Sequence, residues 1–116
     1  MTRPWTLRES RLIAERVMEW QVFEFEGRLW LTDPNQRPKW LWDCAVPDWP
    51  SDPAAAAMAL VAIQMEGVRV SQQWEAEKRL YVVTLHHQHD SRYPVLGEAH
   101  EWPAAVMLAI LAAVER

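Results

Sequence analysis

The sequence contains only three glycines and one cysteine in 116 residues, and each scarcity excludes a class of protein. Because Gly27, Gly67 and Gly97 lie far apart, the chain cannot form the glycine-rich loops that bind dinucleotides or nucleoside triphosphates, nor a nucleophile elbow. Cys44 cannot form an intramolecular disulfide, and the first ten residues lack the apolar run of a signal peptide. We therefore expect a cytoplasmic protein.

Positive charge and long apolar segments are also scarce. The 12 Lys and Arg residues are outnumbered by 16 Asp and Glu residues, which gives a net charge of −4, and the charges are spread evenly. Neither half of the chain has the basic surface that binding to duplex nucleic acid requires. The longest apolar runs, residues 54–65 and 103–114, are too short to cross a bilayer. The sequence therefore disfavours duplex nucleic acid and the membrane as partners.

Tryptophan, in contrast, is abundant. The chain has eight tryptophans, and three of them lie with four prolines in the stretch PKWLWDCAVPDWPSDP, from Pro38 to Pro53. A chain of this length buries roughly two thirds of the surface that it exposes when unfolded. We expect one domain over residues 1–116 that needs no metal or cofactor to fold, so the tryptophans serve either its core or a binding surface.

Three segments carry the signals of helices. Thr6 and Glu9 fit a capping box, which predicts a first helix from there to about Trp20. Asp52 followed by Pro53 is a favoured helix start, and the helix predicted over residues 53–65 has so few polar residues that we expect it to be buried on most of its circumference. A third helix has Pro103 in its first turn.

The strands are expected between these helices. Residues 22–26 and 29–32 predict a hairpin around Gly27 and Arg28, and residues 40–44 predict a short further strand. Residues 68–73 alternate in polarity, whereas 80–85 are apolar on both faces, which is typical of a central strand with helices on both sides. The short turn between the last two favours antiparallel pairing, and a polar loop is expected over residues 86–99.

Read in order, the segments LIAERVMEW, WPSDPAAAAMALVAIQMEG and GEAHEWPAAVMLAILAAVE resemble the phage ABA sandwich domain family of small phage and prophage proteins. The sequence departs from that family at Glu19 and Met58, where the family has Gly and Trp, and at Glu101-Trp102, which replace the small residue that caps the family's last helix. The resemblance implies a phage or prophage origin and a three-layer α/β/α sandwich. With the cytoplasmic location expected above, the protein would act in the host bacterial cytoplasm. Together with the pattern, it predicts an α+β fold with three helices and a mainly antiparallel sheet of about four strands.

The run His86 to Asp90 is a candidate metal site. If the preceding strand continues, His87 and His89 share a face, and with Asp90, His100 or Cys44 they would offer nitrogen, oxygen and sulfur ligands to zinc or nickel. The alternative is a polar strand end with exposed histidines, since no second ligand pair follows at a fixed spacing.

Cys44 is a candidate nucleophile. With one of the histidines and Asp43 or Asp48 it would form a catalytic group, and the alternative is a buried structural thiol.

The tryptophan-rich stretch is the main candidate for binding. Arg37 and Lys39 precede Trp40, Trp42 and Trp49, so the rings would stack on a nucleobase or a proline-rich peptide while a cation meets a phosphate or carboxylate. The alternative is that these rings close one end of a small core, because a small domain needs the apolar area that each ring buries.

These observations favour a protein that acts by binding over an enzyme. The leading hypothesis is that it binds a host protein through a tryptophan-rich surface. The alternatives are a protein that sequesters a small-molecule ligand such as a nucleotide signal, and a metal-dependent enzyme that uses the histidine run. The alanine faces of the second and third helices are compatible with a monomer or a homodimer.

Overall fold

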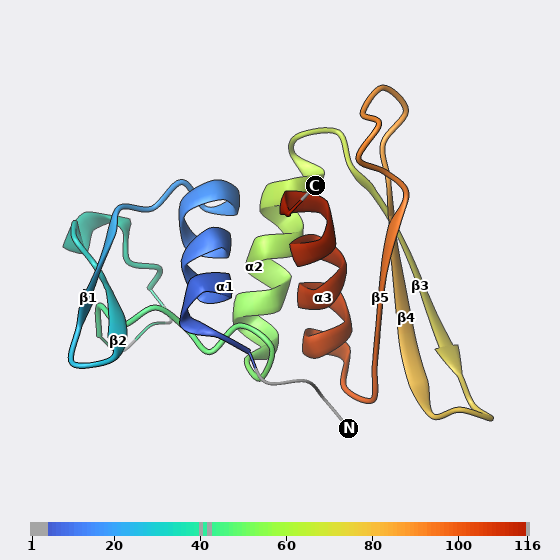
Figure 1. Cartoon of the computed structure of the whole chain (residues 1–116), viewed down its shortest axis with the longest axis horizontal. Coiled ribbons are helices and arrows are strands. Elements are labelled where there is room, and N and C mark those ends of the chain that lie inside the picture. The colour runs from blue at the N-terminus through green and yellow to red at the C-terminus, as the bar shows by residue number, and fades with distance from the viewer. Residues whose placement is uncertain (1–4, 40, 42, 116) are drawn as a thin grey trace.

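The computed structural model describes residues 5–39, 41 and 43–115, and it is an α+β structure with three α-helices and two small antiparallel sheets (Figure 1). Trp40 and Trp42 lie outside the described residues. The elements in chain order are α1 (Leu7–Leu12), the π-helical turn η1 (Ile13–Val17), β1 (Val22–Phe25), β2 (Arg28–Leu31), the 3-10 turn η2 (Pro34–Gln36), α2 (Pro53–Gln64), β3 (Arg69–Glu75), β4 (Leu80–His86), β5 (Val95–Ala99) and α3 (Trp102–Val114).

The first helix begins at the predicted capping box. The Thr6 hydroxyl accepts a hydrogen bond from the Glu9 amide at 3.2 Å, and the Glu9 carboxylate accepts one from the Thr6 amide at 3.0 Å. The helix continues from α1 into η1 and ends where Glu19 adopts a positive φ of 57°. Arg16 of η1 donates a hydrogen bond to the Val114 carbonyl at 3.0 Å, which ties the first helix to the end of α3.

The larger sheet has the strand order β3-β4-β5 and is antiparallel throughout. The prediction of a loop over residues 86–99 is therefore wrong for β5. Its five residues alternate between buried and exposed, and Gly97 lies so close to α3 that a Cβ there would be 2.2 Å from the Ala105 carbonyl oxygen. Glycine disfavours a strand in a sequence pattern, whereas here it allows strand and helix to pack closely.

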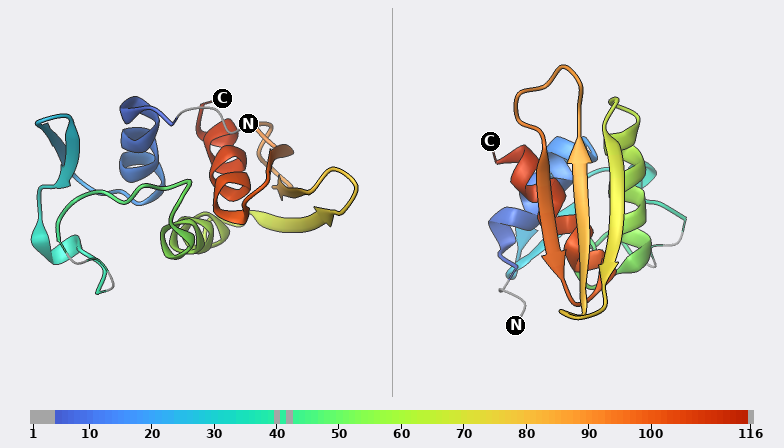
Figure 2. Two further views of the ribbon diagram at one scale, coloured as in Figure 1. Left: turned by 90° about the horizontal axis from the view of Figure 1, so that it is seen from below. Right: turned by 90° about the vertical axis from the view of Figure 1, so that its right-hand side faces the viewer.

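The helices lie on one face of this sheet, as both views in Figure 2 show. Val83 and Leu85 of β4 are buried toward α3, which also packs on β5, and α2 packs on α3. No helix of the described ranges covers the opposite face, so the predicted three-layer sandwich and four-stranded sheet are not confirmed. Leu96, on that opposite face, is 54% exposed.

Helix α2 starts at the predicted N-cap, where the Asp52 carboxylate accepts hydrogen bonds from the amides of Ala54 and Ala55 at 3.0 and 3.2 Å. One face of α2 is buried, but on the other Val61 is 56% exposed and Met65, at the C-cap, is 83% exposed. The expectation that this helix is buried on most of its circumference is therefore wrong, because α3 and η1 pack against one side only.

The core is centred on α3. Ten of its residues are buried, and they pack with Ile13 and Ala14 of η1, the buried face of α2 and the inner face of the larger sheet. Within the part of the chain that the structure describes, none of the helices combines the length and the apolar character needed to span a membrane.

Candidate functional site

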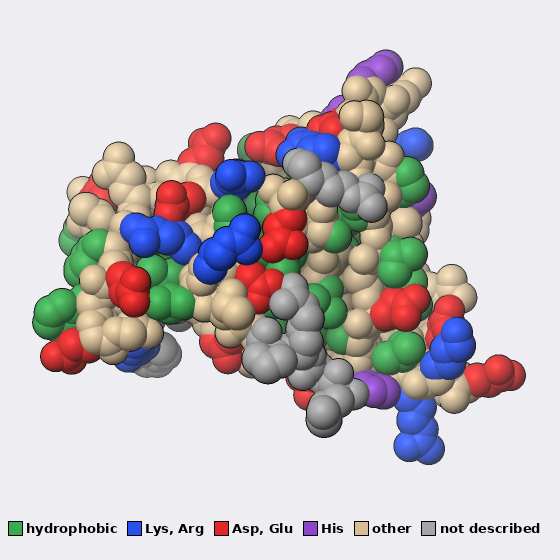
Figure 3. Space-filling view, in the orientation of Figure 1, with side chains coloured by type: hydrophobic (Ala, Val, Ile, Leu, Met, Phe, Trp, Pro, Cys, Tyr) green, Lys and Arg blue, Asp and Glu red, His purple; other side chains and the backbone are tan. Residues whose placement is uncertain are grey.

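The smaller sheet presents an exposed aromatic surface. In the β1–β2 hairpin, Phe23 lies opposite Trp30 and Phe25 lies opposite Arg28, so these four side chains share one face. Phe23 is 46% exposed and Phe25 is 57% exposed. We call this set of four residues the aromatic face; hydrophobic side chains gather at this end of the molecule in Figure 3.

The hairpin turn sets this arrangement. Glu26 and Gly27 both have positive φ, 51° and 76°, as a type I′ turn requires. The sequence pattern predicts the turn at Gly27 and Arg28, whereas in the structure it lies one residue earlier, so Arg28 belongs to β2. Leu29 and Leu31 then point inward and are buried.

Polar contacts hold the aromatic face in place. The Arg28 guanidinium lies 4.9 Å from the centre of the Trp30 ring, at the distance of a cation–π interaction. The Trp30 indole nitrogen donates a hydrogen bond to the Phe25 carbonyl at 3.4 Å. The side of Trp30 that faces the hairpin is thus fixed, while the phenylalanine rings remain open to solvent.

The end of the tryptophan-rich stretch pairs with the hairpin. The Leu31 amide donates to the Cys44 carbonyl at 2.7 Å, and the Val46 amide donates to the Leu29 carbonyl at 2.9 Å. Residues 44–46 therefore lie beside β2, where Ala45 forms an isolated bridge with Trp30, slightly later in the chain than the predicted strand at 40–44.

Trp49 does not contribute to any surface. It is fully buried, and its ring centre lies 5.7 Å from that of Trp20, at the end of the first helix. Its indole nitrogen has no hydrogen-bond partner among the residues that the structure describes. The prediction that Trp49 belongs to an exposed binding surface is wrong, because the proline-rich loop turns this ring into the core; for Trp49 the alternative, a ring that closes the core, is the one observed.

Of the other predicted binding residues, the structure describes Arg37 and Lys39 but not Trp40 and Trp42. Arg37 donates a hydrogen bond to the Leu41 carbonyl within its own loop, and Lys39 is exposed. Four hollows of about 220, 390, 360 and 330 Å³ occur elsewhere on the surface, and none of these four is lined by Arg37 or Lys39. The predicted ligand pocket gains no support from them.

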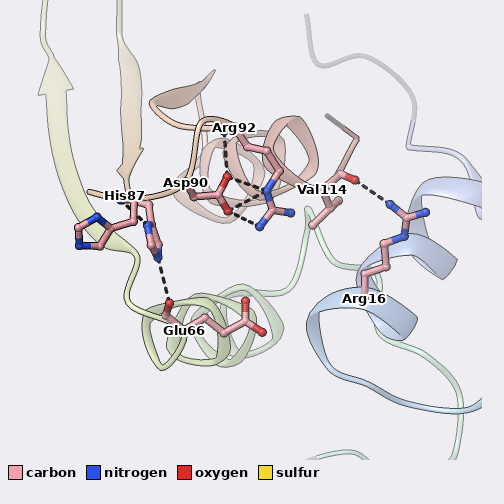
Figure 4. A network of polar contacts seen from close by, with 7 residues as sticks. Arg16, Glu66, His87, Asp90, Arg92 and Val114 are labelled. Carbon is pink, nitrogen blue, oxygen red and sulfur yellow. Dashed lines mark hydrogen bonds and ion pairs between the residues drawn. The ribbon is translucent and has the colours of Figure 1, made fainter.

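The histidine run begins at His86, the last residue of β4, and continues into the loop between β4 and β5, shown in Figure 4. His87 uses both ring nitrogens: Nε2 lies 3.3 Å from the Glu66 carbonyl, and Nδ1 accepts a hydrogen bond from the His89 amide at 3.1 Å. Because Nδ1 accepts, the proton of the neutral ring belongs on Nε2, which donates to Glu66. The His87 ring also stacks on Tyr93, with 5.8 Å between ring centres.

This arrangement does not favour the predicted metal site at His87 and His89. Both nitrogens of His87 are engaged, and among residues 5–39, 41 and 43–115 no group of three or more His, Cys, Asp or Glu side chains is placed to hold a metal ion. His100 is bonded to the Arg79 carbonyl at 2.7 Å, at the opposite end of the sheet, and Cys44 lies beside β2. The same separation keeps Cys44 from the histidines that a catalytic thiol would need.

The rest of this loop is held by an ion pair. The Arg92 guanidinium donates from Nε and Nη2 to the Asp90 carboxylate, with a shortest distance of 2.6 Å, and the Arg92 amide donates to the same carboxylate at 2.9 Å. These bonds, the side-chain bond first, lower the pKa of Asp90 to about 2. Burial raises the pKa of Tyr93. The contacts are local and order the loop.

A shallow groove separates the hairpin from α1. Hollows of about 220 and 330 Å³ share Leu7 and Leu29 in their lining. The first is also lined by Arg28 and the second by Arg8 and Arg11. The groove therefore adjoins the aromatic face through Arg28, and its lining combines leucines with arginines and with two carboxylates, those of Asp48 and Glu24.

Sequence reasoning missed the aromatic face, although the alternation in VFEF was a signal for it. Paired with the buried alternation of β2, that pattern puts both phenylalanines on the outer side of the hairpin. Comparison of the chain with models of protein families, with curated proteins and with solved structures finds no match.

Proposed function

We propose that this chain is a small phage- or prophage-type accessory protein of the host bacterial cytoplasm that acts by binding a host protein through the aromatic face. The observation that carries the binding role is the exposed pair Phe23 and Phe25 beside Trp30 on one side of the hairpin. The phage origin and the host partner rest on the sequence resemblance.

The aromatic face has the composition of an interface centre. Aromatic residues and arginine are enriched at interface hot spots, and an exposed pair of phenylalanines is best explained by a partner that covers it. Trp30 and Arg28 are already held by contacts within the hairpin, so little rotamer entropy is lost when a partner binds them.

The groove beside the aromatic face indicates the chemistry of the partner. Arg8 is paired with Glu115 at 3.4 Å and Arg11 with Glu15 at 2.7 Å, and all four side chains are substantially exposed. Exposed pairs of this kind contribute little stability and exchange readily. Because Glu24 and Asp48 also line the groove, we expect a partner surface with an apolar centre and with charges of both signs at the edge facing α1.

The test is a binding experiment with the double variant Phe23→Thr/Phe25→Thr. Threonine keeps the β propensity of the strand and removes the rings. The wild-type protein is used to capture its partner from a bacterial lysate, the partner is purified, and its Kd is measured by calorimetry. Each hot-spot ring contributes about 1–2 kcal/mol, so we expect the double variant to bind at least about tenfold more weakly.

The matched control is Leu96→Thr, which removes an apolar side chain of similar exposure from β5. It should bind the captured partner like the wild type, and both variants should melt within a few degrees of it. An unchanged Kd in a folded Phe23→Thr/Phe25→Thr protein would refute the aromatic face as the binding surface.

A further inference from the structure

A second candidate surface lies at the other end of the molecule, at the free edge of β3. This seven-residue strand pairs with β4 along its whole length, and no strand of the described residues pairs with its other side. Natural edge strands are usually protected by prolines, bulges or charges along their length. β3 carries charges only at its two ends, Arg69 and Glu75; the residues between them, VSQQW, include no proline or charge, and their register with β4 has no bulge.

Helix α2 leaves an apolar stripe uncovered on the same side. Ala54, Ala57, Val61 and Met65 are exposed and lie three or four residues apart, so they share one helix face. The segment 53–65 contains no charged residue. Exposed apolar surface of this kind, on a helix without charges, marks an interaction site.

The position of the stripe follows from the order of the layers. Helix α3 packs on β5 and β4, and the buried face of α2 packs on α3. The stripe lies opposite that buried face, so it points away from α3. This is also the direction that leads across the sheet from β5 to β3. Both views in Figure 2 agree, with α2 on the β3 side of the helix layer.

We infer that this corner of the fold accepts an extended segment of a partner protein as a fourth strand beside β3. An added strand satisfies the backbone groups of the β3 edge, and its inward side chains extend the row formed by Val70, Gln72 and Trp74 on the helix side of the sheet. Because successive strand residues alternate between faces, the segment has apolar residues toward the stripe and polar residues toward solvent.

Charge adds one further feature of the segment. Arg69 is exposed and makes no ion pair with the rest of the described chain, whereas Glu75 is paired with Lys78 at 3.7 Å. A carboxylate opposite Arg69 on the solvent face of the added strand is favoured, since opposite charges on neighbouring strands attract.

A second copy of this chain fits the corner poorly. Two β3 strands paired antiparallel about a two-fold axis keep both α2 helices on the same side of the sheet. Neighbouring strands are about 5 Å apart, whereas packed helices need roughly 8–10 Å between their axes. Because α2 lies behind β3, the two helices would overlap. A single extended segment meets no such obstacle.

The site is independent of the aromatic face, which lies at the opposite end of the molecule in Figure 1. Its test uses a phage-displayed library of random twelve-residue peptides selected on the full chain. We expect a consensus that alternates apolar and polar residues, and we expect the amides of β3 to gain protection from hydrogen exchange when a selected peptide binds.

The variant Val61→Glu puts a charge into the stripe, and Leu96→Glu, at nearly the same exposure on the uncovered sheet face, is its control. We expect Val61→Glu to weaken the selected peptide at least about tenfold, because a charge facing apolar residues is costly. Leu96→Glu should change the affinity less than about twofold, and so should Phe23→Thr/Phe25→Thr, which separates this site from the proposed function.

Three results would overturn the inference. One is that the library yields no binding peptide. Another is that a selected peptide binds Val61→Glu as tightly as the wild type or leaves the exchange of the β3 amides unchanged. The last is that sedimentation shows a wild-type dimer which Val61→Glu converts to a monomer, since the occupant of the corner would then be a second copy.

Discussion

The close packing of β5 on α3 predicts that Gly97→Ala is severely destabilising. A Cβ at this position would lie 2.2 Å from the Ala105 carbonyl oxygen and 2.4 Å from the Ala109 amide nitrogen. Ordinary contact begins near 3.4 Å, so the backbone of α3 would have to move by about 1 Å. That helix fills the core, and a shift of it disturbs Met107 and Ile110, both fully buried.

Overpacking in a core costs about 1–3 kcal/mol in general. Here the obstacle is helix backbone and not the end of a flexible side chain, so we expect a loss of about 3 kcal/mol or more. For a chain of this length that corresponds to a fall in Tm on the order of 10 °C. The measurement is thermal and urea unfolding followed by circular dichroism.

Gly27→Ala is the matched control. Gly27 has open space around it, and its substitution is disfavoured only by the positive φ of 76°. A left-handed conformation costs an alanine about 1–2 kcal/mol. Equal destabilisation by the two variants, or a loss below 1 kcal/mol for Gly97→Ala, would refute the reasoning, because the strand and helix would then not be in direct backbone contact.

Two smaller predictions concern ends and loops. Thr6→Ala removes the capping box and should lower the free energy of unfolding, measured in urea, by about 1 kcal/mol. Thr6→Ser should unfold close to the wild type. An unchanged urea midpoint for the alanine variant would contradict the role of the cap. The pKa of Asp90, about 2, lies below the ordinary 3.8, so its interaction with Arg92 stabilises the loop above about pH 4 and is lost as the pH falls through about 2. A carboxyl NMR titration should show this midpoint and should show it rise toward the ordinary value in Arg92→Gln; a midpoint near 4 in the wild type would contradict the ion pair.

The helices were predictable because their signals are local. The capping box at Thr6 is read from four consecutive residues and the N-cap at Asp52 from two, and both are confirmed. Strand β5 was missed because its evidence is not local: Gly97 lowers strand propensity, and only the neighbouring helix α3 shows why it is there. The apolar composition of α2 predicted that most of its surface is buried. Composition does not show, however, on how many sides other elements pack against a helix.

The candidate site was predictable only in part. The sequence predicts that its aromatic rings serve either the core or a binding surface. Which of the two holds for a given ring depends on contacts between segments that are distant in the sequence. Trp49 is buried because Trp20, at the end of the first helix, packs on it. The two nitrogens of His87 are engaged by the backbone of Glu66 and His89, and the first of these contacts spans 21 residues. Neither the contact between Trp20 and Trp49 nor that between His87 and Glu66 can be predicted from the residues next to it in the sequence.

The central position of α3 has a consequence for how this protein tolerates mutation. Almost every residue of α3 is buried against other elements, so changes there act on the whole core. Phe23, Phe25, Val61 and Met65, in contrast, are exposed and lie outside the core cluster. Substitutions at exposed positions usually change stability by less than about 0.5 kcal/mol. Residues of the two proposed binding surfaces can therefore change during evolution with little effect on stability. Most substitutions in α3, in contrast, would destabilise the fold, so its sequence can change much less.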